Sequence, residues 1–183
     1  DALPPGLLQW DGYGSNIAAD GERLRQTVQG YYYRGTFGVL GEWIESSQDV
    51  RVASGTGAGT RATLRNDAWQ ISGGCVLTGE DAGYRGVVKP SSPFAIGGDG
   101  WGALELAARY GRLEIDEGAF PLFANAASSA QAIRSWGLGL NWYLTQNFKL
   151  VTNYTQASFD GGAAAGADRA DEKALFTRAQ LSF

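Results

Sequence analysis

Six charged side chains lie at alternate positions of segments whose residues otherwise alternate between apolar and polar. They are Arg25, Glu42, Glu105, Arg109, Lys149 and Arg178. Arginine suits oxyanions, because its planar guanidinium donates to two oxygens at once. Arginine is also the more frequent basic residue of the chain. Of its 15 basic residues, only Lys89, Lys149 and Lys173 are lysines. These positions predict the charged lining of a water-filled passage that contacts small anions. For each residue alone, a solvated charge without a role in selectivity stays open.

Catalytic and metal chemistry find little support in the sequence. The chain has no His, which excludes Ser-His pairs and the common zinc sites. The lone Cys75 falls on an apolar side and is interpreted as a small apolar filler. The glycine-rich stretch 55–60 lacks the Gly-Lys-Ser/Thr continuation of a phosphate-binding loop. Glu42 and Glu105 could imitate a glycosidase pair, but lumen lining explains them better. We therefore expect no enzyme activity, no cofactor and no metal.

Charge and hydropathy exclude further classes. The net charge is −4 and the isoelectric point about 4.8, which argues against nucleic acid as a partner. No stretch approaches eighteen apolar residues, so helical membrane spans are excluded. The sequence begins at Asp1 without an initiator Met, charged leader or apolar leader core. A mature form or a fragment is therefore expected, with export to be inferred from other features.

Alternation with a period of two predicts seven strands in one domain, 1–183. Residues 1–21 read as loop, and the strands occupy 22–183. The expected strands begin at Glu22, Gly38, Ala68, Gly102, Ser135, Phe148 and Glu172. The last one sets Leu175, Thr177, Ala179, Leu181 and Phe183 on one face, so that this face ends on a terminal aromatic residue.

The strands are long enough to cross a bilayer obliquely. Most of them span about ten to thirteen residues, and short connections alternate with long ones. Aromatic residues gather near strand ends, where a headgroup belt would place them. The interface candidates are Tyr31, Tyr32, Tyr33, Trp142, Phe148 and Phe183. The pattern predicts an all-β antiparallel transmembrane β-barrel with its apolar face toward lipid. A soluble ligand-binding barrel is the remaining alternative outside the membrane.

Seven strands do not close such a barrel alone. Bacterial barrels of one chain have an even number of strands, eight or more, and an open edge in lipid leaves backbone groups unpaired. Either residues 1–21 hide another strand, or the chain is the C-terminal part of a larger barrel. We favour the second interpretation.

Six segments, in order along the chain, resemble the C-terminal half of the phosphate-selective porins O and P. They are YYYRGTFG (31–38), LTGED (77–81), VKP (88–90) with PF (93–94), WGALELAARY (101–110), GLGLNWYL (137–144) and RAQLSF (178–183). The resemblance implies a sixteen-stranded porin of the Gram-negative outer membrane, usually a homotrimer, that passes anions such as phosphate by passive diffusion. Its implied partners are outer-membrane lipid, lipopolysaccharide and small anionic solutes. Without the resemblance, a non-transporting structural barrel or adhesin would fit the strands as well.

The long segment 79–100 stands out among the connections. If the C-terminus is periplasmic, this segment lies on the periplasmic side, together with the turns 35–38 and 145–147. At more than twenty residues it is too long for a passive connector. We expect it to fold into the pore mouth and to bring Glu80, Asp81, Arg85 and Lys89 to the lumen. A solvated long turn is the alternative.

Overall fold

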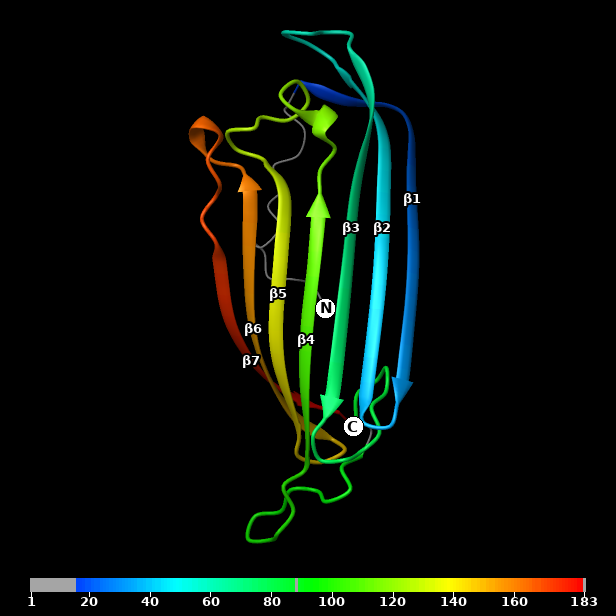
Figure 1. Ribbon diagram of the computed structural model, residues 1–183, viewed down its shortest axis with the longest axis vertical. Helices are drawn as coiled ribbons and strands as arrows, with labels where there is room; N and C mark the ends of the chain where they lie inside the picture. The colour runs from blue at the N-terminus through cyan, green and yellow to red at the C-terminus, as the bar shows by residue number, and fades with distance from the viewer. Residues whose placement is uncertain (1–15, 88, 183) are drawn as a thin grey trace.

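The structure, a computed structural model, describes residues 16–87 and 89–182. One antiparallel sheet contains seven strands in chain order, each paired with the next (Figure 1). The strands are β1 (Ile17–Arg34), β2 (Phe37–Val52), β3 (Arg61–Val76), β4 (Ala103–Glu114), β5 (Ala130–Tyr143), β6 (Phe148–Gly161) and β7 (Glu172–Leu181). Two 3₁₀ turns, η1 (Glu117–Ala119) and η2 (Ala164–Gly166), lie in the upper loops. Within the described residues, no helix is long and apolar enough to cross a membrane.

The all-β antiparallel prediction and its seven strands are confirmed, but several strands are longer than expected. β1 begins at Ile17 instead of Glu22, so residues 17–21 of the expected loop are strand. β3 begins at Arg61 instead of Ala68, and β5 at Ala130 instead of Ser135. The added residues lie at the upper ends in Figure 1, where Arg61, Thr63 and Arg65 point outward and Leu64 packs inward under a loop, so the pattern of an apolar outer and a polar inner side ends. Residues 1–15 and Phe183 lie outside the described residues.

The register divides the strands into two faces. Directly opposed residues share a face, so one face carries Arg25, Glu42, Glu105 and Lys149 and is called the polar face. The other carries Trp69, Leu138 and Leu175 and is called the apolar face. Cys75 opposes Phe37 and Leu106 on the apolar face, as predicted.

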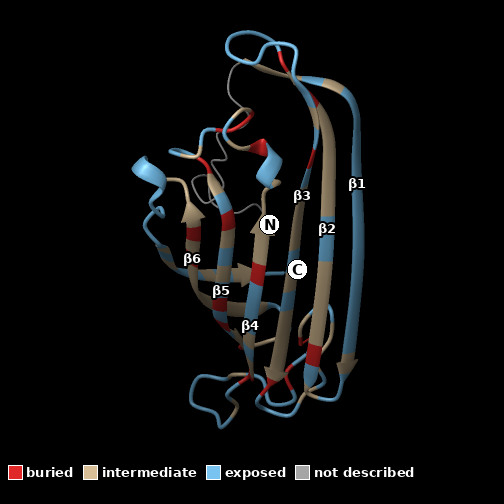
Figure 2. Cartoon of the chain, turned by 45° about the horizontal axis from the view of Figure 1, so that its top comes forward, coloured by how far each residue is buried: buried red, intermediate tan, exposed pale blue. Residues whose placement is uncertain are grey.

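The sheet is a single layer, and much of each strand is exposed or only half-buried (Figure 2). Its buried apolar residues form two small clusters. One lies at the upper end, where Phe123 and Ala124 pack on Val50, Val52 and Leu64. The other lies at the lower end, where Val87 packs with Val76, Ala103 and Tyr143. Each cluster marks a connection that folds back onto the polar face.

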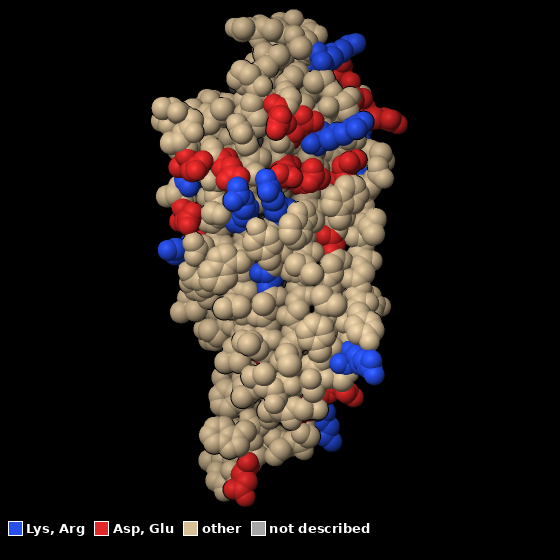
Figure 3. Space-filling view, in the orientation of Figure 1, with Lys and Arg blue, Asp and Glu red and all other residues tan. Residues whose placement is uncertain are grey.

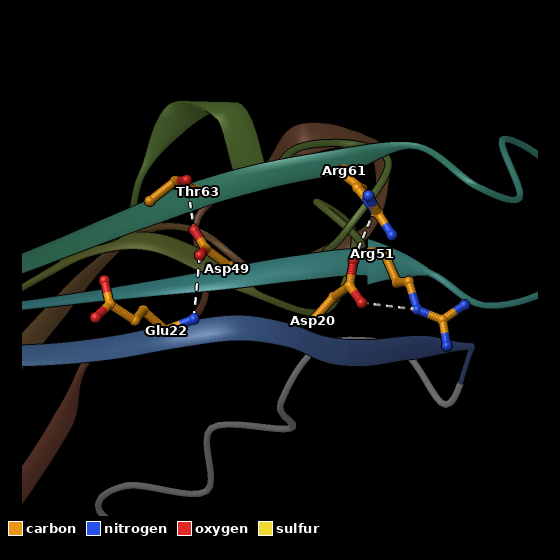
Figure 4. A network of polar contacts seen from close by, with 6 residues as sticks. All are labelled: Asp20, Glu22, Asp49, Arg51, Arg61 and Thr63. Carbon is orange, nitrogen blue, oxygen red and sulfur yellow. Dashed lines mark hydrogen bonds and ion pairs between the residues drawn. The ribbon is translucent and has the colours of Figure 1, made fainter.

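Polar contacts fix the upper end of β1 to its neighbours (Figure 4). Asp20 forms ion pairs with Arg51 of β2 at 3.3 Å and with Arg61 of β3 at 2.7 Å. Asp49 accepts hydrogen bonds from the Thr63 hydroxyl at 2.6 Å and from the Glu22 amide at 3.1 Å. These contacts surround the irregularity between Ala19 and Arg23, where the register of β1 shifts. They hold three strands together across a local break in the ladder.

Candidate functional site

The polar face collects all six charged candidates of the strands. Arg25 lies on β1, Glu42 on β2, Glu105 and Arg109 on β4, Lys149 on β6 and Arg178 on β7, and the register sets them on one side of the sheet. Four of them are cations and two are carboxylates. The face is therefore cationic along its strands although the chain as a whole is acidic.

Glu105 is the centre of a hydrogen-bond network near the lower end of this face. Its Oε2 atom accepts from the Asn141 amide nitrogen at 2.9 Å and from the Tyr143 hydroxyl at 2.7 Å. The Lys149 ammonium lies 5.5 Å from the centroid of the Tyr143 ring. Alternation predicted Asn141 and Tyr143 on the same side of their strand, but neither was among the predicted site residues. Their position opposite Glu105 and Ala103 in the register was the signal that could have found them.

Residues 77–87, the inner strap, cover the polar face at its lower end. The Ala82 amide donates to the Gly35 carbonyl at 2.7 Å, which ties the strap to the turn between β1 and β2. Val87 packs in the lower cluster against Tyr143. Gly86 has a φ of 79°, and a Cβ at this position would lie 2.2 Å from the Tyr143 hydroxyl oxygen. Only glycine lets the strap approach the sheet so closely.

A cavity of about 290 Å³ lies between the inner strap and the polar face. Its charged lining consists of Arg85 from the strap, Glu105 from β4 and Lys149 from β6. Three predicted site residues from distant parts of the sequence are thus brought to one cavity.

Residues 89–102, the outer foot, take a different course. The Phe94 amide donates to the Leu144 carbonyl at 2.7 Å, and the Phe94 ring meets Trp142 edge-on at 5.9 Å between centroids. Trp142 belongs to the apolar face, so the foot passes under β5 and β6 and away from the cavity. Lys89 is exposed and does not line the cavity. The long segment therefore reaches the polar face through its first half.

Glu80 joins the two halves of this segment. Its carboxylate accepts from the Thr78 hydroxyl, from the Ser91 amide at 2.9 Å and from the Ser91 hydroxyl at 2.6 Å. Partial burial acts to raise the pKa of Glu80, but the hydrogen bonds from Ser91 and Thr78 outweigh it and lower the pKa from 4.5 to about 2. Glu80 is thus a clamp between strap and foot, and neither it nor the exposed Asp81 lines the cavity.

The Glu80 clamp predicts a pH window. Because the pKa is depressed in the folded protein, the stabilisation is complete above pH 4.5, declines as the pH falls from 4.5 and is lost below about 2. Cleavage of segment 77–102 by pepsin should be slower in the protein than in Glu80→Gln at pH 4.5, and the rates should converge near pH 2. Equal cleavage at pH 4.5 would show that the clamp contributes nothing.

The upper part of the polar face is covered by the loop between β4 and β5. Asp116 accepts from the Arg65 amide at 2.7 Å and from the Gly118 amide at 2.8 Å, and this fixes the start of the loop. Below it, Arg109 lines a hollow of about 260 Å³ together with Glu42 and Gln70, which are hydrogen-bonded at 2.8 Å. Arg109 and Glu105 therefore line two different hollows of one face.

The apolar face carries two rows of aromatic residues with aliphatic residues between them. The upper row contains ring contacts between Trp69 and Tyr110 at 5.5 Å and between Trp136 and Tyr154 at 5.3 Å. The lower row is formed by Tyr32, Phe37, Trp142 and Phe148. The aliphatic side chains between the rows are widely exposed, with Leu175 at 73% and Leu181 at 69%. So large an apolar surface marks contact with a membrane or a partner.

Two ion pairs of the apolar face lie above its upper aromatic row, whereas Arg34 lies at the lower end opposite Phe37. Arg112 pairs with Glu114 at 2.5 Å and Arg134 with Asp160 at 2.6 Å. Figure 3 shows charged side chains across the upper part of the strands and a largely uncharged surface below. This sequence of charged residues, aromatic row, aliphatic band and aromatic row follows the depth profile of a bilayer.

The register also redistributes the predicted interface aromatics. Tyr32, Trp142 and Phe148 lie on the apolar face, as expected for residues at a lipid boundary. Tyr31 and Tyr33 lie on the polar face, because neighbouring residues of a strand point to opposite sides. They belong to the surroundings of the cavity and not to the lipid boundary.

A single-layer antiparallel sheet with an aromatic-bounded apolar face and a charged opposite face defines the class of porin-type β-barrel proteins. The chain belongs to the family of phosphate-selective porins O and P, whose sequence profile matches residues 4–183. No curated protein shows significant similarity to the chain. Family membership confirms the resemblance found in the sequence and supports an outer-membrane porin, a channel instead of an enzyme.

Proposed function

We propose that the chain forms part of the wall of a water-filled pore through which small anions, phosphate among them, diffuse passively. The observation that carries the proposal is the polar face, which gathers the cations Arg25, Arg109, Lys149 and Arg178 against the carboxylates Glu42 and Glu105. The ion pairs Arg112–Glu114 and Arg134–Asp160 lie on the opposite face. Such a face raises the local concentration of anions in a confined aqueous space. Family membership supports this use of the face.

The proposed setting is the outer membrane of a Gram-negative bacterium. The seven strands supply one part of a sixteen-stranded barrel, and the barrel assembles as a homotrimer. The apolar face contacts lipid, and the charged groups above its upper aromatic row contact lipopolysaccharide. The open edges at β1 and β7 support the larger barrel, because lipid offers no partner for an unpaired strand edge.

Reversal potentials in asymmetric KCl test the proposal with protein reconstituted in planar bilayers. The unmodified protein should prefer chloride, and Arg109→Glu should lower the ratio of anion to cation permeability roughly fivefold. Two units of charge about 8 Å from an ion in water are worth about 1 kcal/mol, with opposite signs for an anion and a cation. Screening over that distance in about 0.1 M salt reduces the resulting difference of about 2 kcal/mol to about 1 kcal/mol, which corresponds to the fivefold change.

The control is Arg134→Gln, which removes a cation from the apolar face, where Arg134 pairs with Asp160. Its reversal potential should equal that of the unmodified protein. Absence of current would indicate a non-transporting barrel or adhesin. An equal shift in both variants would show that the polar face does not line the pore.

A further inference from the structure

The cavity under the inner strap contains two cations without a carboxylate partner. Within residues 16–87 and 89–182, neither Arg85 nor Lys149 forms an ion pair, although both line this cavity. Lys149 forms a cation–π interaction with the Tyr143 ring, and Arg85 is exposed. A guanidinium and an ammonium on opposite walls fit an oxyanion between them.

The same cavity also contains a hydrogen-bond acceptor, the carboxylate of Glu105. A bare oxyanion has no hydrogen to donate to it. Asn141 and Tyr143 both donate their hydrogen bonds to the Oε2 atom of this carboxylate. Its Oε1 atom lies over Gly74, 3.0 Å from where a Cβ would stand, and has no hydrogen bond among the described residues. A carboxylate oxygen attracts donors such as hydroxyl groups and repels bare anions.

Aromatic rings form the third part of the lining. Tyr33 and Tyr84 line the cavity, and Tyr31 bridges them with centroid distances of 5.9 Å to Tyr33 and 5.6 Å to Tyr84. The Tyr33 ring packs against Gly38, where a Cβ would come within 2.3 Å of two ring carbons. Tyr31 and Tyr84 nevertheless remain 65% exposed, so holding the strap uses only a minor part of their surface. Exposed rings in a water-filled space favour a ligand with a carbon framework.

We infer that this cavity binds a small organic anion that carries hydroxyl groups, such as a phosphorylated or carboxylated sugar. Arg85 and Lys149 would hold the oxyanion, Glu105 Oε1 would accept from a hydroxyl group, and Tyr33 and Tyr84 would contact the carbon framework. The volume of about 290 Å³ is at the lower end of small-molecule pockets and suits a ligand of monosaccharide size. The inference rests on the proposed pore, through which the ligand reaches the cavity.

Calorimetric titration of the detergent-solubilised protein tests the site without depending on conduction. The probes are glucose 6-phosphate, gluconate, inorganic phosphate and glucose. Glucose 6-phosphate should bind about tenfold more tightly than inorganic phosphate, since one hydroxyl contact and one ring contact add to the shared oxyanion contact. Glucose, which lacks the anion, should bind no more tightly than inorganic phosphate. Comparison of the affinities for gluconate and glucose 6-phosphate shows whether the cavity prefers a carboxylate or a phosphate group.

Three variants assign the contacts. Tyr84→Ala should reduce the affinity for glucose 6-phosphate to that for inorganic phosphate, whereas Tyr84→Phe retains the ring and the preference. Arg85→Gln should lower the affinity for glucose 6-phosphate and for inorganic phosphate at least fivefold each. The matched control is Arg169→Gln, because Arg169 pairs with Glu172 near an upper loop and is not part of the cavity lining.

Inorganic phosphate binding as tightly as glucose 6-phosphate would overturn the inference, and so would glucose binding as tightly as its phosphate ester. If Tyr84→Ala still bound glucose 6-phosphate more tightly than inorganic phosphate, the Tyr84 ring would not contact the carbon framework of the ligand. Binding in micelles without current in bilayers would leave the cavity intact and refute the pore. Normal anion current with no preferential binding would refute the cavity and leave the pore intact.

Discussion

Replacing Leu138 with arginine is expected to destabilise the membrane-inserted protein by about 2–4 kcal/mol, the usual cost of such a charge near the bilayer midplane. Leu138 lies on the apolar face of β5 between Trp136 of the upper aromatic row and Trp142 of the lower one, and it is half exposed. The measurement is denaturant unfolding of protein reconstituted in phospholipid vesicles. Two controls are needed. One measures the effect of losing the leucine side chain, and the other measures the effect of an arginine on the opposite face of the same strand.

The first control, Leu138→Ala, removes the side chain without adding a charge and should cost far less than Leu138→Arg. The second, Ser135→Arg, places the same charge on the polar face of the same strand. It should be close to neutral, because that face borders water. If Ser135→Arg and Leu138→Arg destabilised the protein equally, the assignment of faces to lipid and water would fail.

Gly86→Ala is expected to detach the inner strap from the sheet. The new Cβ would lie 2.2 Å from the Tyr143 hydroxyl oxygen, at a φ of 79° that L-residues rarely adopt. Gly97→Ala provides a matched control, since Gly97 has a φ of 78° in the outer foot and no atom within 4 Å of its Cβ position. Both variants carry the same backbone cost, so their difference isolates the contact with Tyr143.

Gly86→Ala should therefore destabilise its segment by about 1–3 kcal/mol more than Gly97→Ala, the usual range for overpacking. Protease cleavage within 77–87 should become faster, and single-channel conductance should rise as the strap leaves the polar face. Gly97→Ala should keep the conductance of the unmodified protein. Equal conductance in all three proteins would show that the strap does not narrow the pore.

Strand number and facing were predictable because lipid on one side and water on the other impose strict alternation. In β5, Trp136, Leu138, Leu140 and Trp142 alternate with smaller or more polar residues, and the register sets the two series on opposite faces. The pattern of an apolar outer side and a polar inner side is reversed at the upper end, where Arg61, Thr63 and Arg65 point outward and Leu64 packs inward, so residues 61–66 were assigned to a loop although they are strand. The prediction that Tyr31, Tyr32 and Tyr33 all lie at the membrane interface differs from the structure for another reason. Their clustering indicated a lipid boundary, while their spacing required them to divide between the faces.

The candidate site was only partly predictable, because its connections pack through contacts that carry no periodicity. Charges on the strands could be assigned to one face from spacing alone. The paths of the inner strap and outer foot depend on Gly86 fitting against Tyr143 and on Glu80 bonding Ser91, contacts between residues distant in the sequence. Of the four residues of this segment expected at the lumen, Arg85 lines the cavity of the polar face, whereas Glu80, Asp81 and Lys89 do not.

Coverage of the polar face from both ends has an electrical consequence. The inner strap covers its lower part and the loop between β4 and β5 its upper part, which leaves a short length of strand wall between them. In a conductor of uneven width, the narrowest length has the highest resistance, and most of an applied voltage falls across it. In the proposed pore, a permeating ion would thus meet its steepest field along the covered lengths, beside Glu105 under the inner strap and beside Arg109 below the loop between β4 and β5, and charges on the open length between them would act on it far more weakly.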